Sequence, residues 1–333
     1  MSKPTYRGAI LAAGRGSRMQ PFSDVFPKPL LPVCNKPMIV HQIEFMASLG
    51  IREVVVLIGH KGYEIAKELG DGSAYGVSVR YVEQEKMLGI GHAVGRLERE
   101  MQDDSFLLML GDIYFVPNDF QRIFRQFEER PGGAVLATKE ELDPKAIRMN
   151  FAIIQDASGL VTHVIEKPRH TPNRLKGIGV YLFDPSIFDA IRRTPRTALR
   201  DEYELTDAIQ VMIEDGHPVT VANVVTEDIN LTAPVDLLRA NIVHSRACPP
   251  AQVCGDNRWW HPGARVYNSV IGPGATIIEP IEITDSLVFP GTRVESKASL
   301  DRVIVTGQGI VDCRPYIKAS ELSAAMAVRA AAS

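Results

Sequence analysis

Short apolar runs alternate with segments of helical periodicity from residue 7 to about residue 245. The run Glu53–Ile58 is typical of a buried strand, and the segment 63–69 that follows has the apolar spacing of a helix. This alternation predicts a helix-covered, mostly parallel sheet whose ligands bind beyond the carboxyl ends of the strands. Further strands are expected at 8–13, 77–82, 106–110, 133–138, 151–154, 161–165 and 178–183, and further helices near 37–49, 91–101, 118–130, 186–193, 205–215 and 234–246.

Beyond Pro249 and Pro250 the helical periodicity stops and a short repeat begins. The segments NSVIGPGATI, DSLVFPGTRV and DRVIVTGQGI start at residues 268, 285 and 301, and Trp260–Val266 has the form of a preceding half-coil. The offsets of 17 and 16 residues between these segments favour a parallel β-helix, in which each coil stacks on the last. We therefore expect two domains, at residues 1–246 and 247–333, the second being a short β-helix with a tail.

Composition excludes several classes of protein. With 333 residues, 45% hydrophobic and 23% charged, the chain is ordinary globular protein and long enough for two domains. The net charge of -3 offers no general attraction for nucleic acid. No apolar run approaches the roughly 20 residues that span a bilayer, and the four cysteines form neither a C-x-x-C pair nor a secreted disulfide pattern. Without a signal segment, the expected location is a reducing cytoplasm.

A glycine turn follows the first apolar run. In LAAGRGSRMQPFSDVFPKP, which covers residues 11–29, Gly14 and Gly16 stand where a buried strand must turn and its backbone can approach a ligand closely. Arg18 and Lys28 add positive charge beside that turn, the first as a planar fork and the second as a point charge. Backbone N–H groups with two cations predict a site for a polyphosphate.

Two familiar phosphate motifs do not fit this turn, because Met19 replaces the third glycine of a dinucleotide fingerprint and no Gly-Lys-Ser/Thr occurs. The pattern G-x-G-S-R-M-x-P followed by P-K-P instead resembles the signature of sugar-1-phosphate nucleotidylyltransferases, over residues 7 to about 245. The resemblance implies a Rossmann-like mixed α/β sheet of the GT-A-like nucleotidyltransferase type. It also implies that nucleotide contacts come from Ala13, Gly14, Gly16 and Ser17, with Arg18 and Lys28 as catalytic residues.

The resemblance also implies a magnesium site. The strand 106–110 leads into Gly111 and Asp112, and the aspartate of this L-G-D is a magnesium ligand in the family. The second ligand lies before the last helix of the domain, where counting back from Pro234 gives Asn230 and a slip of two residues gives Asp228 instead. Both residues remain candidates for the second magnesium ligand, with Asn230 favoured. Asp236 is expected to cap or solvate the following helix.

Two more segments match the family in order. Gln84 and Gly89, which lies in the segment Leu88–Val94, resemble the residues of the family that contact the edge of the pyrimidine. The side-chain amide of Gln84 supplies both the donor and the acceptor that a uracil-like imide needs. This form resembles uridylyl- and thymidylyltransferases, and His92 within it is expected to orient the start of a helix.

The E-K-P sequence at residues 166–168 is the last motif that matches the family. The resemblance implies that Gly111, Glu166, Lys167 and Gly179 bind the sugar phosphate and the sugar, and that Lys167 is also catalytic. Pro168 is expected to kink the strand. Ala152 stands where glycine is common in the family.

The expected reaction is therefore magnesium-dependent nucleotidyl transfer from UTP or dTTP to a sugar-1-phosphate. One alternative is a non-catalytic homologue that senses nucleotide sugars or acts as a scaffold. Two departures from the family pattern favour it: Asp228 stands in place of a tryptophan, and Ala152 stands in place of a common glycine. Another is acyl transfer on the C-terminal repeat, which resembles a left-handed hexapeptide-repeat β-helix; there His261 is the candidate, although a lone histidine more often packs or caps. A third is a non-sugar phosphate such as phosphocholine, against which Glu166 argues. The repeat also predicts a homo-oligomer, because exposed coil ends present unpaired strand edges.

Overall fold

The computed structural model describes residues 6–170, 173–198, 200–248 and 253–324. Within these ranges the chain forms two compact units. Unit 1 contains residues 6–15 and 42–228, and unit 2 contains residues 16–41 with the described part of the chain from 229 onward. This division differs from the expected boundary at residue 246, which stays a prediction, and Pro249, Pro250 and the last nine residues lie outside the described ranges.

Unit 1 is built on a mixed nine-stranded sheet with the strand order β10-β9-β11-β6-β1-β4-β5, in which β8 also pairs with β11, and β12 pairs with β8. Its strands β6, β1, β4 and β5 run parallel to one another, as expected, whereas β11 runs antiparallel to β6, β8 and β9. The strands are β1 (Arg7–Ala12), β4 (Glu53–Ile58), β5 (Ser78–Glu83), β6 (Phe106–Leu110), β8 (Ala134–Glu140), β9 (Phe151–Gln155), β10 (Val161–Glu166), β11 (Leu175–Phe183) and β12 (Val219–Asn223).

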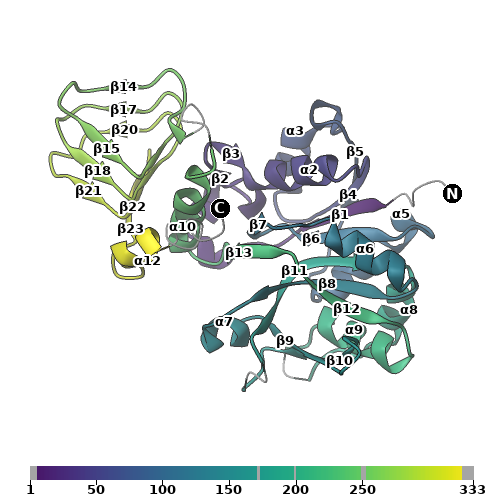
Figure 1. Cartoon of the computed structure of the whole chain (residues 1–333). Coiled ribbons are helices and arrows are strands. Elements are labelled where there is room, and N and C mark those ends of the chain that lie inside the picture. The colour runs from purple at the N-terminus through teal and green to yellow at the C-terminus, as the bar shows by residue number, and fades with distance from the viewer. Residues whose placement is uncertain (1–5, 171–172, 199, 249–252, 325–333) are drawn as a thin grey trace. The chain divides into compact units, whose positions relative to one another are not determined.

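Helices cover this sheet because each has one apolar face. In Figure 1, α9 packs on β10, and α6 packs on β8 and β12. The Phe106 ring stacks on Phe188 at a centroid separation of 5.4 Å, within a core that β1, β4, β6 and β8 also line. The helices are α2 (Met38–Ser48), which begins in unit 2, α3 (Gly62–Leu69), α4 (Ile90–Gly95), α5 (Glu98–Met101), α6 (Arg122–Glu129), α7 (Pro144–Arg148), α8 (Ser186–Arg193) and α9 (Leu205–Glu214).

Some elements depart from the expected bounds. The single helix expected at 91–101 is interrupted and becomes α4 and α5, and the helix expected from 118 begins only at Arg122. The pattern did not predict β12, or the two-stranded pair formed by β7 (Ile113–Pro117) and β13 (Val225–Asn230). Among the described helices, none combines the length and the apolar character needed to cross a membrane.

The C-terminal part of unit 2 consists of short parallel strands in three sheets (Figure 1). In each sheet the pairing register is 17 residues, as in Trp259 with Thr276 and Thr276 with Arg293. The aliphatic side chains that the sheets enclose form a core of their own. The sheets contain β14 (Trp259–Trp260), β17 (Thr276–Ile277) and β20 (Arg293–Val294); β15 (Arg265–Tyr267), β18 (Glu282–Thr284) and β21 (Leu300–Asp301); and β16 (Val270–Ile271), β19 (Leu287–Val288) and β22 (Val303–Thr306), with β23 (Gly309–Asp312) antiparallel to β22.

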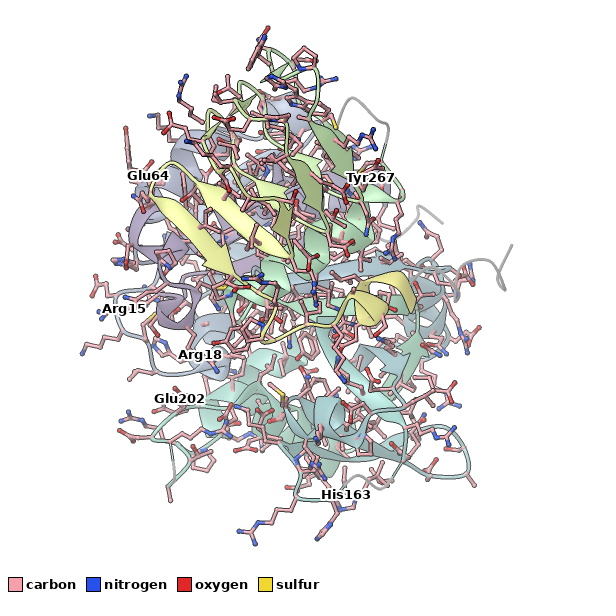
Figure 2. The ribbon with its side chains drawn as sticks, turned by 90° about the vertical axis from the view of Figure 1, so that its left-hand side faces the viewer. Arg15, Arg18, Glu64, His163, Glu202 and Tyr267 are labelled. Atoms are coloured by element: carbon pink, nitrogen blue, oxygen red, sulfur yellow. The ribbon has the colours of Figure 1, made fainter. Side chains whose placement is uncertain are left out.

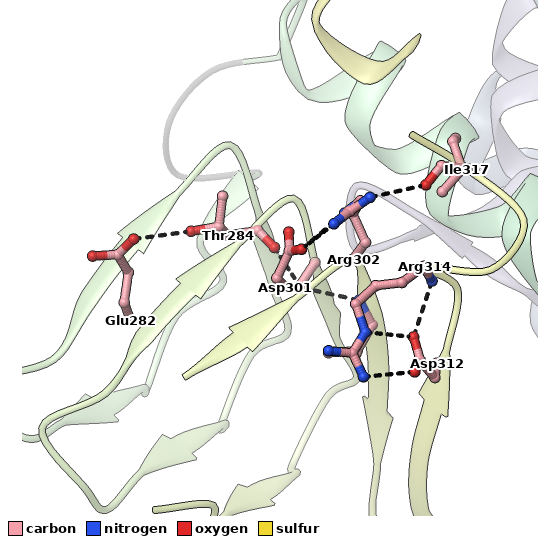
Figure 3. Close-up of polar contacts among 9 residues, drawn as sticks. Glu282, Thr284, Asp301, Arg302, Asp312, Arg314 and Ile317 are labelled. Atoms are coloured by element: carbon pink, nitrogen blue, oxygen red, sulfur yellow. Dashed lines mark hydrogen bonds and ion pairs between the residues drawn. The ribbon is translucent and has the colours of Figure 1, made fainter. Parts of the chain in front are cut away.

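The last repeat begins one residue later than the expected offset of 16. Asn268, Asp285 and Arg302 occupy equivalent positions, with left-handed φ values of 42°, 47° and 49°. Asn and Asp tolerate this conformation better than most residues, whereas Arg302 is held there by its contacts. Its N–H donates to the Thr284 carbonyl at 3.1 Å, and its guanidinium contacts Asp301 and the Ile317 carbonyl (Figure 3).

Residues 16–41 form the second part of unit 2. They comprise the 3-10 turns η1 (Ser17–Met19) and η2 (Lys28–Leu30), helix α1 (Phe22–Val25), and the hairpin of β2 (Pro32–Val33) and β3 (Lys36–Pro37). The Phe22 ring stacks on Phe289 at 5.4 Å, and Asn241 of α10 (Pro234–Ser245) bonds to the backbone of the hairpin. These long-range contacts explain why this segment groups with the C-terminal strands and with α12 (Ala319–Ala324).

Candidate active site

Unit 1 brings several of the expected site residues to one edge of its sheet. Strands β6, β1, β4 and β5 are parallel neighbours, so their carboxyl ends lie along the same edge. Asp112 follows β6, Gly14 follows β1 and Gln84 follows β5. The Gly111 N–H donates to the Leu11 carbonyl at 2.8 Å and the Gln84 N–H to the Ile58 carbonyl at 2.8 Å, which fixes both strand ends.

The two glycines at this edge have different surroundings. A Cβ on Gly111 would lie 2.6 Å from the Leu11 carbonyl oxygen and 3.2 Å from the Ala12 Cα, so the close approach of β6 to β1 requires glycine there. A Cβ on Gly14 would meet none of the described atoms within 4 Å. Gly14 therefore has open space on its side-chain side, whereas Gly111 is required for the close packing of the strand ends.

In unit 2 the second glycine of the turn supports the lysine. Gly16 has a left-handed φ of 68°, and a Cβ there would lie 2.7 Å from Cγ and 2.9 Å from Cε of Lys28. The Lys28 stem thus lies across Gly16, which places the ammonium beside the turn. Met19, in the position of the missing third glycine, is fully buried and anchors η1, whereas Ser17 and Arg18 are exposed; Arg18 is labelled in Figure 2.

Replacing Gly16 with alanine is expected to destabilise the protein by about 1–2 kcal/mol, because an L residue is strained in the left-handed region. The added methyl group would also displace the Lys28 stem. Gly14→Ala is the matched control for stability, with an expected change within about 0.5 kcal/mol. Urea unfolding of both variants checks this, and equal destabilisation by the two would contradict the contact seen at Gly16.

Glu166 and Lys167 lie on the same side at the end of β10, although neighbouring strand residues normally point to opposite faces. Lys167 itself has a left-handed φ of 44°, so the kink lies there and not at Pro168, as the sequence had suggested. The Lys167 Nζ is 3.5 Å from Glu166 Oε1. Burial raises the pKa of the Glu166 carboxyl, while Lys167 opposes that rise.

Arg200 is a further residue of this site that the sequence did not predict. Its Nη1 lies 3.6 Å from Glu166 Oε1 and 2.8 Å from Glu204 Oε1. The spacing of Arg200 and Glu204 by four residues was the only available signal, and nothing in it indicates Glu166. The carboxylate proposed for sugar hydroxyls is therefore held between two cations.

Gln84 is buried, and its amide is oriented by a histidine. Gln84 Nε2 donates to His92 Nδ1 at 3.1 Å, in the tautomer that carries the proton on Nε2. Burial lowers the pKa of His92, and the nearby Arg96 and Lys86 lower it further, so the imidazole is neutral. The His92 ring thus contacts the Gln84 side chain, and its expected role in orienting the start of its helix stays a prediction.

Gly89 lies in the loop before α4 with a φ of 103°, close against Tyr203. The Gly91 N–H donates to the Tyr203 carbonyl and the Tyr203 N–H donates to the Leu88 carbonyl, both at 2.8 Å. A Cβ on Gly89 would lie 2.6 Å from the Tyr203 carbonyl oxygen. The loop proposed to read the base is thus fixed by backbone contacts that only glycine permits.

Asp228, the alternative metal ligand, is engaged within unit 1. Its carboxylate accepts hydrogen bonds from Lys176 Nζ at 2.7 Å and 2.9 Å, and Lys139 Nζ lies 3.7 Å away. The Asp228 side chain is only 1% exposed. Two lysines of unit 1 already balance the negative charge of this carboxylate.

Three further expectations have a structural outcome. Asp236 accepts from the N–H groups of Thr232 and Ala233 at 2.9 Å and 2.7 Å, which confirms that it caps α10. His261 Nδ1 accepts from the Gly263 N–H at 3.0 Å and so closes a turn, as expected of a capping histidine. A Cβ on Gly179 would lie 2.2 Å from Cδ1 of Ile113, so packing alone already requires this glycine.

Comparison with known proteins identifies the family of this chain. The model of the nucleotidyl transferase family matches residues 7–228. The low-salt glycan biosynthesis nucleotidyltransferase Agl11 of Haloferax volcanii is 39% identical over 71% of this chain and 65% of its own length. The glucose-1-phosphate thymidylyltransferase of Streptomyces antibioticus is 32% identical over 86% of this chain and 82% of its own. A solved structure from Bacillus anthracis, assigned as a glucose-1-phosphate thymidylyltransferase in complex with a sucrose, has a TM-score of 0.66 and 28% identity over 74% of this chain and 98% of its own.

Proposed function

Since the chain belongs to the nucleotidyl transferase family, we propose that it transfers a nucleotidyl group from a nucleoside triphosphate to a sugar-1-phosphate and releases pyrophosphate. UTP and dTTP are the favoured donors. One observation carries this proposal: the match over residues 7–228 contains the strand edge with Gly14, Gln84 and Asp112. The relatives named for thymidylyl transfer support a pyrimidine donor.

In the proposed reaction an oxygen of the sugar phosphate attacks the α-phosphorus in line, and pyrophosphate leaves. The second pKa of a phosphate ester is about 6, so the nucleophile is already largely dianionic and needs no protein base. Catalysis then consists of positioning and charge stabilisation. Lys167 holds the sugar phosphate, Glu166 accepts hydrogen bonds from sugar hydroxyls, and Arg18 and Lys28 hold the β- and γ-phosphates.

The nucleotide is proposed to bind through the glycine turn and the loop before α4. Ala13, Gly14, Gly16 and Ser17 offer backbone groups, and Gln84 with the backbone of Gly89 addresses the pyrimidine. Because Gln84 Nε2 donates to His92, its Oε1 is left to accept from an imide N–H of the base. That orientation suits uracil and thymine alike.

A magnesium ion is proposed at Asp112, with Asn230 as the second protein ligand. Asp112 is a half-buried residue just after the carboxyl end of β6, and its hard oxygen donors fit Mg²⁺, which usually takes few protein ligands. The two lysines on Asp228 make that residue the weaker candidate. When bound, the ion would supply positive charge to the phosphate oxygens.

The C-terminal strands are proposed to be a short left-handed hexapeptide-repeat β-helix. The constant 17-residue register and the enclosed aliphatic core support this. The turn-closing contact of His261 speaks against acyl transfer there. Self-association through these coils and a cytoplasmic location both stay predictions.

The decisive experiment mixes the purified protein with magnesium, a panel of sugar-1-phosphates and each of UTP, dTTP, GTP, ATP and CTP, and measures pyrophosphate release. Release with one or two pairs would establish the transfer and identify both substrates. Silence across a folded sample would favour the sensing or scaffolding homologue. Acetyl-coenzyme A with candidate amines, in a parallel assay, tests the acyl-transfer alternative.

The His92 contact predicts a dependence of stability on pH. Because the pKa of His92 is lowered in the folded state, its neutral form stabilises the protein above the ordinary histidine pKa of about 6.5. That contribution is lost as the pH falls through the lower folded-state pKa, where Nδ1 becomes a donor and opposes the Gln84 amide. His92→Asn keeps an acceptor without titrating, so its unfolding free energy should fall less than that of the wild type between pH 7.5 and 5.5. If the unfolding free energies of the variant and the wild type fell equally with pH, the contact between His92 and Gln84 would not be the cause of the pH dependence.

A further inference from the structure

Unit 2 contains a cluster of metal-binding side chains outside the residues assigned to nucleotidyl transfer. One ligand atom from each of Cys34, His244 and Cys248 lies within 4.8 Å of the others. Cys34 lies in the turn between β2 and β3, whereas His244 and Cys248 lie four residues apart at the end of α10. Two thiols and an imidazole therefore converge from segments more than 200 residues apart in the chain.

The backbone at Cys34 is specialised for this position. Cys34 and Asn35 form a two-residue hairpin turn with φ values of 46° and 63°, a conformation that normally selects asparagine and glycine. A cysteine is strained in this left-handed region, yet Cys34 is fully buried. Such strain at a residue with a reactive side chain often accompanies a function.

Contacts to α10 fix the direction of the Cys34 side chain. Asn241 Oδ1 accepts from the Cys34 N–H at 2.8 Å, and Asn241 Nδ2 donates to the Pro32 carbonyl at 2.9 Å. The Cys34 thiol lies 3.5 Å from the Asn241 carbonyl oxygen. The hairpin turn is therefore hydrogen-bonded to α10, and the Cys34 sulfur lies at the Asn241 carbonyl, in the same helix as His244 and before Cys248, which follows the helix end at Ser245.

The surroundings of His244 also suit a metal ligand. The His41 ring lies edge-on against His244, with centroids 4.7 Å apart, and His41 Nε2 contacts the Val33 carbonyl at 2.9 Å. Val33 is the residue before Cys34, so the same hairpin that carries one sulfur also supports the imidazole.

We propose that Cys34, His244 and Cys248 bind one zinc ion, with a water molecule as the fourth ligand. Thiolate and imidazole are the donors that Zn²⁺ favours, and a tetrahedral ion with Zn–S bonds of about 2.3 Å sets two sulfurs roughly 3.8 Å apart. Donor atoms within 4.8 Å reach this geometry by small side-chain rotations. The ion would crosslink the β2–β3 hairpin, which follows the Lys28 segment, to α10. The existence of this zinc site does not depend on the proposed function.

The test uses the full-length protein, reduced and stripped of metal, and titrates it with Co²⁺. Thiolate ligands give an intense charge-transfer absorption with cobalt, which should saturate at one equivalent and disappear when Zn²⁺ is added. Cys34→Ser and Cys248→Ser should each weaken cobalt binding more than a hundredfold, since even partners of ligands contribute 10- to 100-fold. Cys313→Ser is the matched control, because Cys313 is also a buried free cysteine of unit 2 and should leave the titration unchanged.

Circular dichroism of each variant separates loss of the site from loss of the fold. If the fully buried Cys34→Ser variant does not fold, the half-buried Cys248→Ser variant and His244→Asn carry the test. Absence of the charge-transfer band in folded wild-type protein would overturn the proposal. So would equal cobalt binding by Cys248→Ser and the wild type, or a metal-free protein in which Cys34 and Cys248 are purified as a disulfide.

Discussion

Replacing Lys176 with alanine is expected to reduce the free energy of unfolding by about 3–5 kcal/mol, because it would leave a buried charge unpaired. Lys176 and Asp228 are 6% and 1% exposed, and they meet with Nζ–O distances of 2.7 Å and 2.9 Å. In the variant, Lys139 Nζ would remain near the Asp228 carboxylate, at 3.7 Å. Urea unfolding at neutral pH, followed by circular dichroism, measures the effect.

Two controls separate the unpaired charge from a simple loss of packing. The double change Lys176→Met with Asp228→Leu removes both charges and fills similar volume, so it should recover most of the lost stability. Lys139→Ala removes a more exposed lysine that is shared with Glu141 and Glu227, and its cost should be smaller. A Lys176→Ala variant within 1 kcal/mol of the wild type would show that water reaches Asp228 and that the pair is not essential.

This ion pair illustrates what sequence reasoning missed. The two residues are 52 positions apart, and neither lies in a motif that pairs them. A lysine in an apolar strand and an aspartate near a family motif both have ordinary explanations when they are read separately. The structure shows the contact directly, because it places the Asp228 carboxylate beside the ammonium groups of Lys176 and Lys139.

The predicted parts of the fold are those in which local pattern and burial agree. Strands β4 and β6 were predicted with their observed bounds, because both are uninterrupted apolar runs that end in glycine or polar residues. The edge that carries Gly14, Gln84 and Asp112 follows from parallel strands alone. By contrast β12 and β13 are mixed in polarity, and tertiary pairing, not local pattern, makes them strands.

The C-terminal repeat was recognised, but its last register was one residue off. Aligning Asp301 with Asp285 by residue type gave the offset of 16, whereas the backbone aligns Arg302 with Asp285. A conformational requirement, here a left-handed residue in each coil, therefore set the register more strictly than the side chain did. Likewise, the left-handed φ at Lys167 turned the proposed sugar-phosphate lysine to the side of Glu166 without help from Pro168.

The grouping of residues 16–41 with the C-terminal strands had no local signal either. It depends on the stacking of Phe22 on Phe289 and on the bonds from Asn241 to the hairpin at Cys34. The consequence for function is that Arg18 and Lys28 belong to a different compact unit from Asp112 and Lys167. A sequence read as consecutive domains assigns all four to one domain.

Lys28→Ala is expected to lower kcat for pyrophosphate release by about 10²- to 10³-fold, the cost of removing one preorganised donor for developing charge. The negative charge on the β- and γ-phosphates grows as the bond to the α-phosphorus breaks, so an ammonium placed there binds the transition state more tightly than the substrate. The stem of Lys28 across Gly16 supplies the preorganisation, since it fixes the ammonium before substrate arrives.

Initial rates at saturating sugar-1-phosphate and varied nucleoside triphosphate separate kcat from KM. Lys28→Arg keeps the charge but not the fit of the stem across Gly16, so it should recover only part of the rate. Lys67→Ala, on the exposed surface of α3, is the matched control and should retain the wild-type rate. A change confined to KM would mean that Lys28 holds the ground-state triphosphate only, and its role as a catalytic residue would have to be abandoned.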